Sequence, residues 1–220
     1  PIDSNDRSTI GGLIAANGYG RKKFLHKTTR FYVMGMEFVS PRGELIKVGG
    51  RTIKNVSSYD LHQLLAGSWG VFGIITKAIL KVKPKPEKEL VLETTAKDGT
   101  ELLKVLEKVL FSEKINLASL TFEQSHWGFP VRAELEGFAQ TLQEQQEMLE
   151  NEYGFRVPEG FFTTQSKENI TIALPLKNYI KGLEKILELK QKKPQLNIRG
   201  NAGSGLIYLN FSGIESIIEK

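Results

Sequence analysis

Two glycine-rich stretches decide how this sequence is interpreted: Ser8-Thr9-Ile10-Gly11-Gly12-Leu13-Ile14-Ala15-Ala16-Asn17-Gly18 and Gly67-Ser68-Trp69-Gly70-Val71-Phe72-Gly73-Ile74-Ile75-Thr76. The first predicts a short extended piece over residues 8–10, and its paired glycines then open an apolar stretch over residues 13–16. Glycines at such a turn let backbone N–H groups approach an anion closely. The second has three glycines at three-residue spacing, which is typical of a loop whose backbone meets a flat or charged ligand. Tight packing explains each pattern alone almost as well.

The residues around these stretches predict a small, strand-rich unit. Alternating apolar residues indicate strands over residues 33–40 and 44–48, joined by the turn Pro41-Arg42-Gly43. Asp60 is a good N-cap for a short helix that ends near Ala66. A long strand is then expected over residues 73–83.

Pro84-Lys85-Pro86 is the strongest boundary in the chain, because two closely spaced prolines stop both helices and strands. After it the pattern predicts a second unit with an antiparallel sheet and helices on one face, in the order β-α-β-β-α-β of a ferredoxin-like fold. We therefore expect two domains, residues 1–86 and 87–220. The predicted elements are strands over 89–94, 117–123, 130–136, 170–174, 195–199 and 205–210, and helices over 98–110, 138–153 and 177–189.

The composition excludes several kinds of chemistry. The chain of 220 residues has no cysteine and three histidines, which rules out thiolate catalysis and disulfides and argues against a histidine-rich metal site. Redox chemistry would need a bound organic cofactor. The net charge of +5 is spread along the chain, so a solvated face is a better interpretation than a nucleic-acid surface. No apolar run is long enough to span a bilayer, and we expect a cytoplasmic protein without membrane insertion.

In order and spacing, the two glycine segments resemble the second half of the FAD-binding domain in the vanillyl-alcohol oxidase and para-cresol methylhydroxylase (PCMH) superfamily. Within it, they are most similar to FAD-binding subunits of bacterial glycolate oxidase, and then to D-lactate dehydrogenases. Several other motifs fit the same order: Arg30, Glu37-Phe38-Val39, Arg42-Gly43, Lys54-Asn55-Val56 and Tyr59-Asp60. The resemblance covers residues 1–86. It implies an α+β chain, with the second half of a PCMH-type FAD-binding domain followed by a substrate or cap domain, either complete or truncated.

The same resemblance implies FAD as the cofactor and no metal. The residues it places along the flavin and its diphosphate are Ser8, Thr9, Ile10, Gly11, Gly12, Asn17, Gly70, Gly73, Ile74 and Ile75. Relatives also have a preceding subdomain with a glycine-rich pyrophosphate loop, which has no counterpart in these 220 residues. We therefore expect this chain alone to hold FAD weakly, and its apolar glycine segments to be covered by a second copy or a partner, which Arg21-Lys22-Lys23 could orient.

A late glycine-rich turn, Arg199-Gly200-Asn201-Ala202-Gly203-Ser204-Gly205, resembles the turn where catalytic relatives place a histidine beside the flavin. Asn201 takes that position, and an amide cannot accept a substrate proton near neutral pH. Arg199 could pair with a substrate carboxylate, although a surface or partner-facing role is the simpler interpretation. His126 is the least implausible base, but His26, His62 and His126 all fit exposed polar positions. No catalytic residue is assigned.

The resemblance thus implies a subunit of an FAD-dependent oxidoreductase complex of the glycolate oxidase type, which oxidises glycolate or D-lactate. Its partners would be other glycolate oxidase-like subunits or a second copy. The alternative is a non-catalytic structural subunit that keeps the fold without binding FAD. A reductase of cell-wall precursor synthesis on a related FAD fold is a weaker third possibility.

Overall fold

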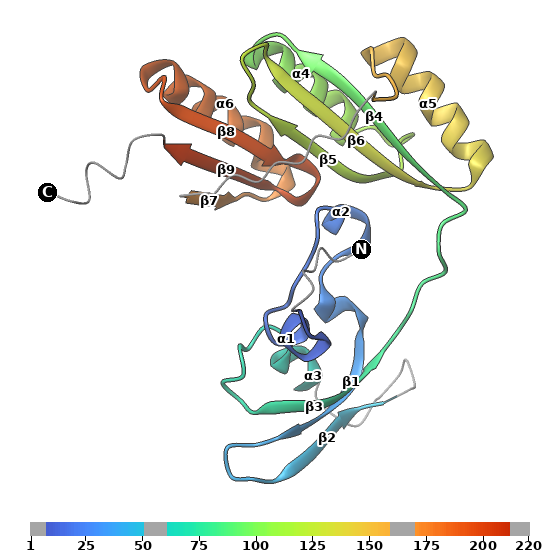
Figure 1. Ribbon diagram of the computed structural model, residues 1–220, viewed down its shortest axis with the longest axis vertical. Helices are drawn as coiled ribbons and strands as arrows, with labels where there is room; N and C mark the ends of the chain where they lie inside the picture. The colour runs from blue at the N-terminus through green and yellow to red at the C-terminus, as the bar shows by residue number, and fades with distance from the viewer. Residues whose placement is uncertain (1–7, 51–60, 159–169, 212–220) are drawn as a thin grey trace, which may run out of the picture. The chain divides into compact units, whose positions relative to one another are not determined.

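The computed structural model describes residues 8–50, 61–158 and 170–211. The chain divides into two compact units, Pro1–Lys85 and Pro86–Lys220 (Figure 1). Among the described residues, no helix has both the length and the apolar character needed to cross a membrane.

The first unit is built on a three-stranded antiparallel sheet in the order β2-β1-β3. Around it lie short helices, and the elements are α1 (Ile10–Ala15), α2 (Lys23–His26), η1 (Thr29–Tyr32), β1 (Val33–Val39), β2 (Leu45–Gly49), α3 (Leu61–Leu65) and β3 (Ile74–Leu80). The turn between β1 and β2 contains Gly43 with φ +82°, a conformation that glycine adopts without strain.

One small apolar cluster holds the first unit together. It joins α1 and α3 to the sheet, and its buried members are Ile14, Val33, Met36, Phe38, Val48, Leu65 and Ala66. Alternation along β1 explains why the sheet lies on this cluster, because successive side chains of a strand point to opposite faces. Both glycine segments contribute to the cluster, the first through Ile14 and the second through Ile75, which is partly buried against it.

The second unit contains a six-stranded sheet in the order β4-β6-β5-β8-β9-β7, with every neighbouring pair antiparallel. Its elements are β4 (Lys88–Ala96), α4 (Gly99–Leu110), β5 (Leu117–Glu123), β6 (Phe129–Gly137), α5 (Ala139–Tyr153), β7 (Ile170–Ala173), α6 (Leu176–Lys192), β8 (Leu196–Asn201), η2 (Ala202–Ser204) and β9 (Leu206–Phe211).

The sheet consists of two halves with the same connectivity. Strands β4, β5 and β6 with α4 form a β-α-β-β half whose last strand lies in the middle, and β7, β8 and β9 with α6 form a second one. The halves meet where β5 pairs with β8, at Thr121↔Asn201, Phe122↔Gly200 and Glu123↔Arg199. The first and last strands of the sheet, β4 and β7, are therefore the first strands of the two halves.

The helices lie along one face of this sheet (Figure 1). On that face Val131, Ala133 and Leu135 of β6 are fully buried, whereas the intervening Arg132 lies on the other face and forms an ion pair with Glu93 of β4 at 2.5 Å. Apolar and polar residues alternate along β6, so the apolar side chains lie on one face of the sheet and the polar side chains on the other. Helix α4 packs so closely on α6 that a Cβ at Gly99 would lie 3.1 Å from Leu187 Cδ1.

The predicted fold class is confirmed: the chain is α+β, with antiparallel sheets and helices on one face of the second sheet. The strand expected over residues 73–83 is shorter and ends at Leu80, before Val82, whose side chain is 90% exposed. The extended piece expected over residues 8–10 is interrupted, because α1 already begins at Ile10. The Asp60 cap and the motif Lys54-Asn55-Val56 with Tyr59 fall outside the described residues.

Candidate functional site

The two glycine-rich segments lie side by side in the first unit. The backbone N–H of Gly67 donates to the carbonyl of Ile14 at 3.0 Å, and that of Trp69 donates to Ala15 at 2.9 Å. Backbone hydrogen bonds therefore hold together two segments that lie some 50 residues apart in the sequence. This is the arrangement expected if both contact the same ligand.

Helix α1 presents the first segment. Thr9 is its N-cap, with an extended backbone and a hydroxyl oxygen that accepts from the Gly12 N–H at 3.0 Å. This cap places Gly11 and Gly12 in the first helical turn, not in a turn before the helix. A Cβ added to Gly11 would meet nothing within 4 Å, so the backbone is open to approach there. Ser8 and Ile10 are exposed beside it.

Asn17 joins the two segments. It has φ +50°, and its side-chain oxygen accepts from the Arg30 N–H at 3.0 Å. The Arg30 Nε in turn donates to the Ala66 carbonyl at 3.1 Å, next to Gly67. A Cβ at Gly67 would lie 3.1 Å from the Asn17 Cβ. The Asn17 oxygen thus already has a structural partner, which the sequence motif alone did not indicate.

The second segment contains two glycines with different surroundings. Gly70 is exposed with φ +81°, and the nearest atom to an added Cβ would be 3.9 Å away. Gly73 is buried with φ +148°, and an added Cβ would lie 2.4 Å from the Val39 carbonyl oxygen. Gly73 is therefore required by the close approach of β1, whereas Gly70 leaves room for a ligand. Beyond it, Ile74 is exposed and Ile75 is half-buried opposite Phe38.

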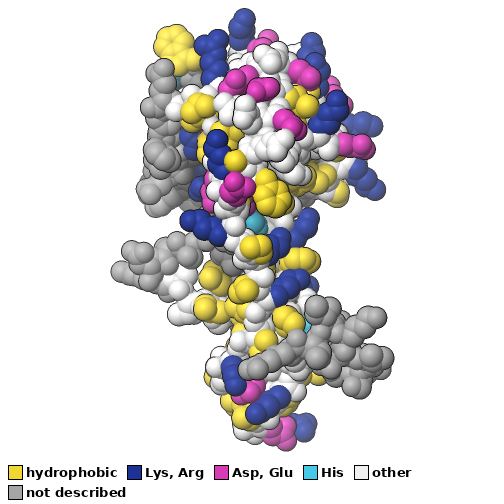
Figure 2. All heavy atoms as spheres, turned by 90° about the vertical axis from the view of Figure 1, so that its right-hand side faces the viewer, with side chains coloured by type: hydrophobic (Ala, Val, Ile, Leu, Met, Phe, Trp, Pro, Cys, Tyr) yellow, Lys and Arg dark blue, Asp and Glu magenta, His cyan; other side chains and the backbone are white. Residues whose placement is uncertain are grey.

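Large apolar side chains surround these glycines and reach the surface. Their exposed fractions are 62% for Ile10, 78% for Trp69, 72% for Val71, 45% for Phe72 and 73% for Ile74. We call these five residues the apolar rim. Hydrophobic side chains on the surface of the first unit are visible in Figure 2. Soluble proteins rarely expose large contiguous apolar surface unless it is an interaction site.

The charges of the chain are divided unequally between the units. Residues 1–85 contain 14 Lys or Arg and 5 Asp or Glu, a formal net charge of +9, whereas residues 86–220 contain 16 and 20, a net charge of −4. The excess of positive charge therefore belongs to the unit that carries the glycine segments. Such a field favours the approach of an anionic ligand or partner.

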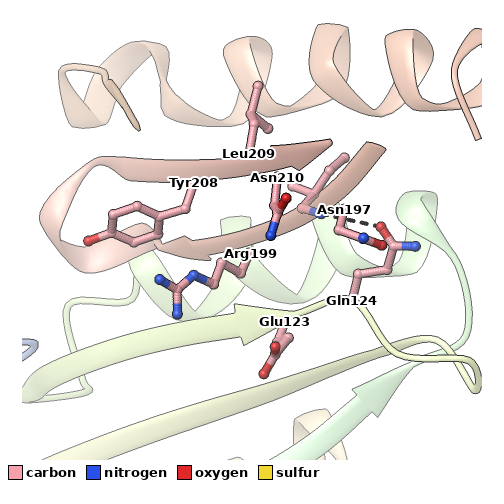
Figure 3. Close-up of a pocket in the computed structure, with 8 residues that line it drawn as sticks. Glu123, Gln124, Asn197, Arg199, Tyr208, Leu209 and Asn210 are labelled. Atoms are coloured by element: carbon pink, nitrogen blue, oxygen red, sulfur yellow. Dashed lines mark hydrogen bonds between the residues drawn. The ribbon is translucent and has the colours of Figure 1, made fainter. Parts of the chain in front are cut away.

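A second candidate region is a polar hollow on the face of the second sheet opposite α4 and α6 (Figure 3). Its volume is about 160 Å³, and it is lined by residues of β5, β8 and β9 and the residue following β5: Glu123, Gln124, Asn197, Ile198, Arg199, Tyr208, Leu209 and Asn210. The Arg199 guanidinium lies over the Tyr208 ring, 4.9 Å from its centroid. The sequence favours a surface or partner-facing role for Arg199. In the structure Arg199 lies in a hollow, because the register of β8 and β9 places it opposite Tyr208.

The late glycine turn offers no acid–base group at Asn201. This residue is 6% exposed, and its side-chain oxygen accepts from the Ser204 N–H at 3.1 Å, which caps η2. His126 lies exposed at the tip of the β5–β6 hairpin. No group of three or more His, Asp or Glu that could hold a metal occurs within the described parts of the chain.

No protein-family model matches the chain. In sequence it is 48% identical over 80 residues to glycolate oxidase subunit GlcD of Bacillus subtilis, 42% identical over 85 residues to a D-lactate dehydrogenase of Archaeoglobus fulgidus, and 31% identical over 105 residues to an FAD-linked oxidoreductase of Mycobacterium tuberculosis. These matches cover 36%, 39% and 48% of this chain but only 17%, 19% and 23% of the relatives. The chain thus corresponds to less than a quarter of the length of each relative.

The fold resembles that of an alkyldihydroxyacetonephosphate synthase, with a TM-score of 0.64 at 13% identity over 96% of this chain and 53% of that one. This structural similarity shows the fold, and the sequence similarity extends over part of the chain only. Over that part, the chain is related to the FAD-linked oxidoreductases of the PCMH and vanillyl-alcohol oxidase type, which include glycolate oxidase subunits and D-lactate dehydrogenases.

Proposed function

We propose that this chain is part of the FAD-binding subunit of a glycolate oxidase-like dehydrogenase complex that oxidises glycolate or D-lactate. The observation that carries the proposal is the junction of the two glycine segments through the Gly67–Ile14 and Trp69–Ala15 backbone hydrogen bonds. Its relatives include a glycolate oxidase subunit and a D-lactate dehydrogenase, which supports the substrate class. Residues 1–86 then form part of the cofactor domain, and residues 87–220 the cap domain.

The surroundings of the glycines fit one side of an FAD molecule. Gly11 and Gly70 leave space next to the backbone, where N–H groups can donate to diphosphate oxygens. The apolar rim offers a surface for a flat aromatic ring, and the net charge of +9 favours an anionic cofactor. When bound, the flavin would supply the hydride acceptor for oxidation of the hydroxyl carbon. By their place in the two glycine segments, the proposed site also includes Ser8, Thr9, Gly12, Asn17, Gly73 and Ile75.

One observation favours the alternative, a subunit that keeps the fold without catalysis. Asn201 occupies the position where the family resemblance expects a histidine, and its amide oxygen is engaged in capping η2. A base for the substrate hydroxyl would therefore have to come from elsewhere, on this protein or on a partner subunit. The two functions differ in whether the first unit binds flavin.

Titration with FAD distinguishes them. We expect the 220-residue chain to quench flavin fluorescence in a saturable but weak manner, since the diphosphate needs further donors for tight binding. Gly11→Leu fills the open side of α1 and should weaken binding at least about tenfold, a loss of about 1.4 kcal/mol. Gly137→Ala is the matched control, because its added Cβ would have no neighbour closer than 4.0 Å. Absence of saturable quenching by the parent chain would favour the non-catalytic subunit.

A further inference from the structure

One side chain bridges the two glycine segments. Arg30 lies in η1, and its guanidinium donates from both Nε and Nη2 to the carbonyl oxygen of Ala66, with an Nε–O distance of 3.1 Å. The Nη2 atom also lies 3.0 Å from the point that a Cβ on Gly67 would occupy. Ala66 is fully buried and directly precedes Gly67, so these contacts fix the start of the second segment.

The backbone around Arg30 is attached to the first segment. The Arg30 N–H donates to the Asn17 side-chain oxygen at 3.0 Å. The preceding Thr29 is buried, and its hydroxyl donates to the Leu13 carbonyl at 3.0 Å. Arg30 is therefore held to the first segment by its backbone and to the second by its side chain.

The second segment needs such support, because its backbone is strained. Trp69 has φ +54°, a left-handed conformation that is unfavourable for a residue with a Cβ. Its side chain is 78% exposed, so packing of the ring does little to offset the strain. Contacts with neighbouring elements must hold the segment, namely the backbone bonds to Ile14 and Ala15 of α1 and the Arg30 contact with Ala66.

The geometry of Arg30 can be separated from its charge. Within residues 8–50, 61–158 and 170–211 the guanidinium contacts a neutral carbonyl and forms no ion pair. Two donors on one oxygen depend on the planar fork of a guanidinium. Lysine keeps the positive charge but cannot reproduce this fork, so Arg30→Lys removes the geometry alone.

We infer that Arg30 is a positioning residue for the proposed cofactor site. It acts through the second segment, by holding residues 67–70 against α1 so that backbone N–H groups of both segments are presented to one ligand. The inference rests on the proposed function for the identity of that ligand, FAD. It predicts that losing the guanidinium weakens FAD binding even where the positive charge is kept.

Amide exchange of the 220-residue chain without flavin, read residue by residue, tests the positioning itself. Arg30→Lys and Arg30→Gln should each speed exchange of the Gly67 and Trp69 N–H groups at least about tenfold, the effect of losing one charge-assisted hydrogen bond. The hydrogen-bonded amides of residues 33–48 should exchange as in the parent chain. Arg42→Gln is the control, because it removes the same charge from an exposed turn of the same unit and should change neither group.

FAD titration of the same variants tests the consequence for binding. Arg30→Lys should weaken FAD binding at least about tenfold, whereas Arg42→Gln should stay within about twofold of the parent chain. Three results would each overturn the inference: unchanged exchange at Gly67 and Trp69, equally faster exchange throughout the first unit, or parent-like FAD affinity in Arg30→Lys. Absence of FAD binding by the parent chain counts against the proposed function instead, and the exchange measurement then decides whether Arg30 positions the segment.

Discussion

Gly73→Ala should destabilise the first unit strongly, whereas Gly11→Ala should not. Gly73 has φ +148°, and its added Cβ would lie 2.4 Å from the Val39 oxygen and 2.8 Å from Phe38 Cδ2. A backbone conformation of this kind costs a residue with a side chain about 1–3 kcal/mol. Forcing β1 and β3 apart to relieve the contact adds about 1–3 kcal/mol. We therefore expect the free energy of unfolding of this unit to fall by about 2–5 kcal/mol.

Gly11 is the matched comparison, because it belongs to the other glycine segment and has open space around it. It lies inside α1, where alanine is favoured over glycine by about 1 kcal/mol. Gly11→Ala should therefore leave stability unchanged or raise it by up to about 1 kcal/mol.

The assay must report on each unit separately, since two units can unfold independently. Urea-dependent amide exchange, read peptide by peptide, gives the free energy of opening for the first unit, and peptides of the second unit are the internal control. A Gly73→Ala protein within about 0.5 kcal/mol of the parent would refute the close approach of Val39.

Three further predictions concern side-chain substitutions. Tyr179→Phe loses a buried hydrogen bond and should cost about 1 kcal/mol near neutral pH. Burial raises the pKa of Tyr179 above its unfolded value of 10.0. The stabilisation that Tyr179 contributes is therefore complete below pH 10.0, and above it falls by up to about 1.4 kcal/mol per pH unit. Denaturation measured as a function of pH should show a smaller loss of stability at high pH in Tyr179→Phe. Lys190→Met removes donors to two carbonyls after α6 and should cost about 1–2 kcal/mol in thermal denaturation, whereas exposed Lys192→Met should change little. Val71→Thr with Ile74→Thr should reduce both the binding of a hydrophobic dye and self-association in sedimentation. Unchanged dye binding and sedimentation would show that the apolar rim is not the surface through which the chain associates.

Local sequence rules predicted most elements of the second unit. The helix expected over residues 98–110 is α4, and it begins at Gly99 because the Asp98 side chain accepts from the Glu101 N–H at 2.9 Å. The strand expected over residues 117–123 is β5 with the same bounds. These elements depend on caps, periodicity and turn residues that lie within a few positions of one another.

Interactions between distant residues could not be predicted in this way. The pairing of β7 with β9 and of β5 with β8 joins strands that are distant in the sequence, and no local pattern encodes which distant strands become neighbours. For the same reason the sequence did not bring Glu123, Arg199 and Tyr208 together. The hydrogen bond that Asn17 accepts could not be predicted either, because its partner Arg30 lies 13 residues away in a different element.

The repeated β-α-β-β connectivity gives the second unit the architecture of a dimer fused into one chain. Its internal two-fold relation places the β5–β8 seam where two copies of a shorter protein would meet. The polar hollow takes Glu123 and Gln124 from one half and its remaining lining residues from the other. Neither half alone contains all the residues that line the hollow, so the hollow exists only where the two halves are joined. Once two such halves share a chain, each can diverge separately, and a symmetric seam can become an asymmetric binding site.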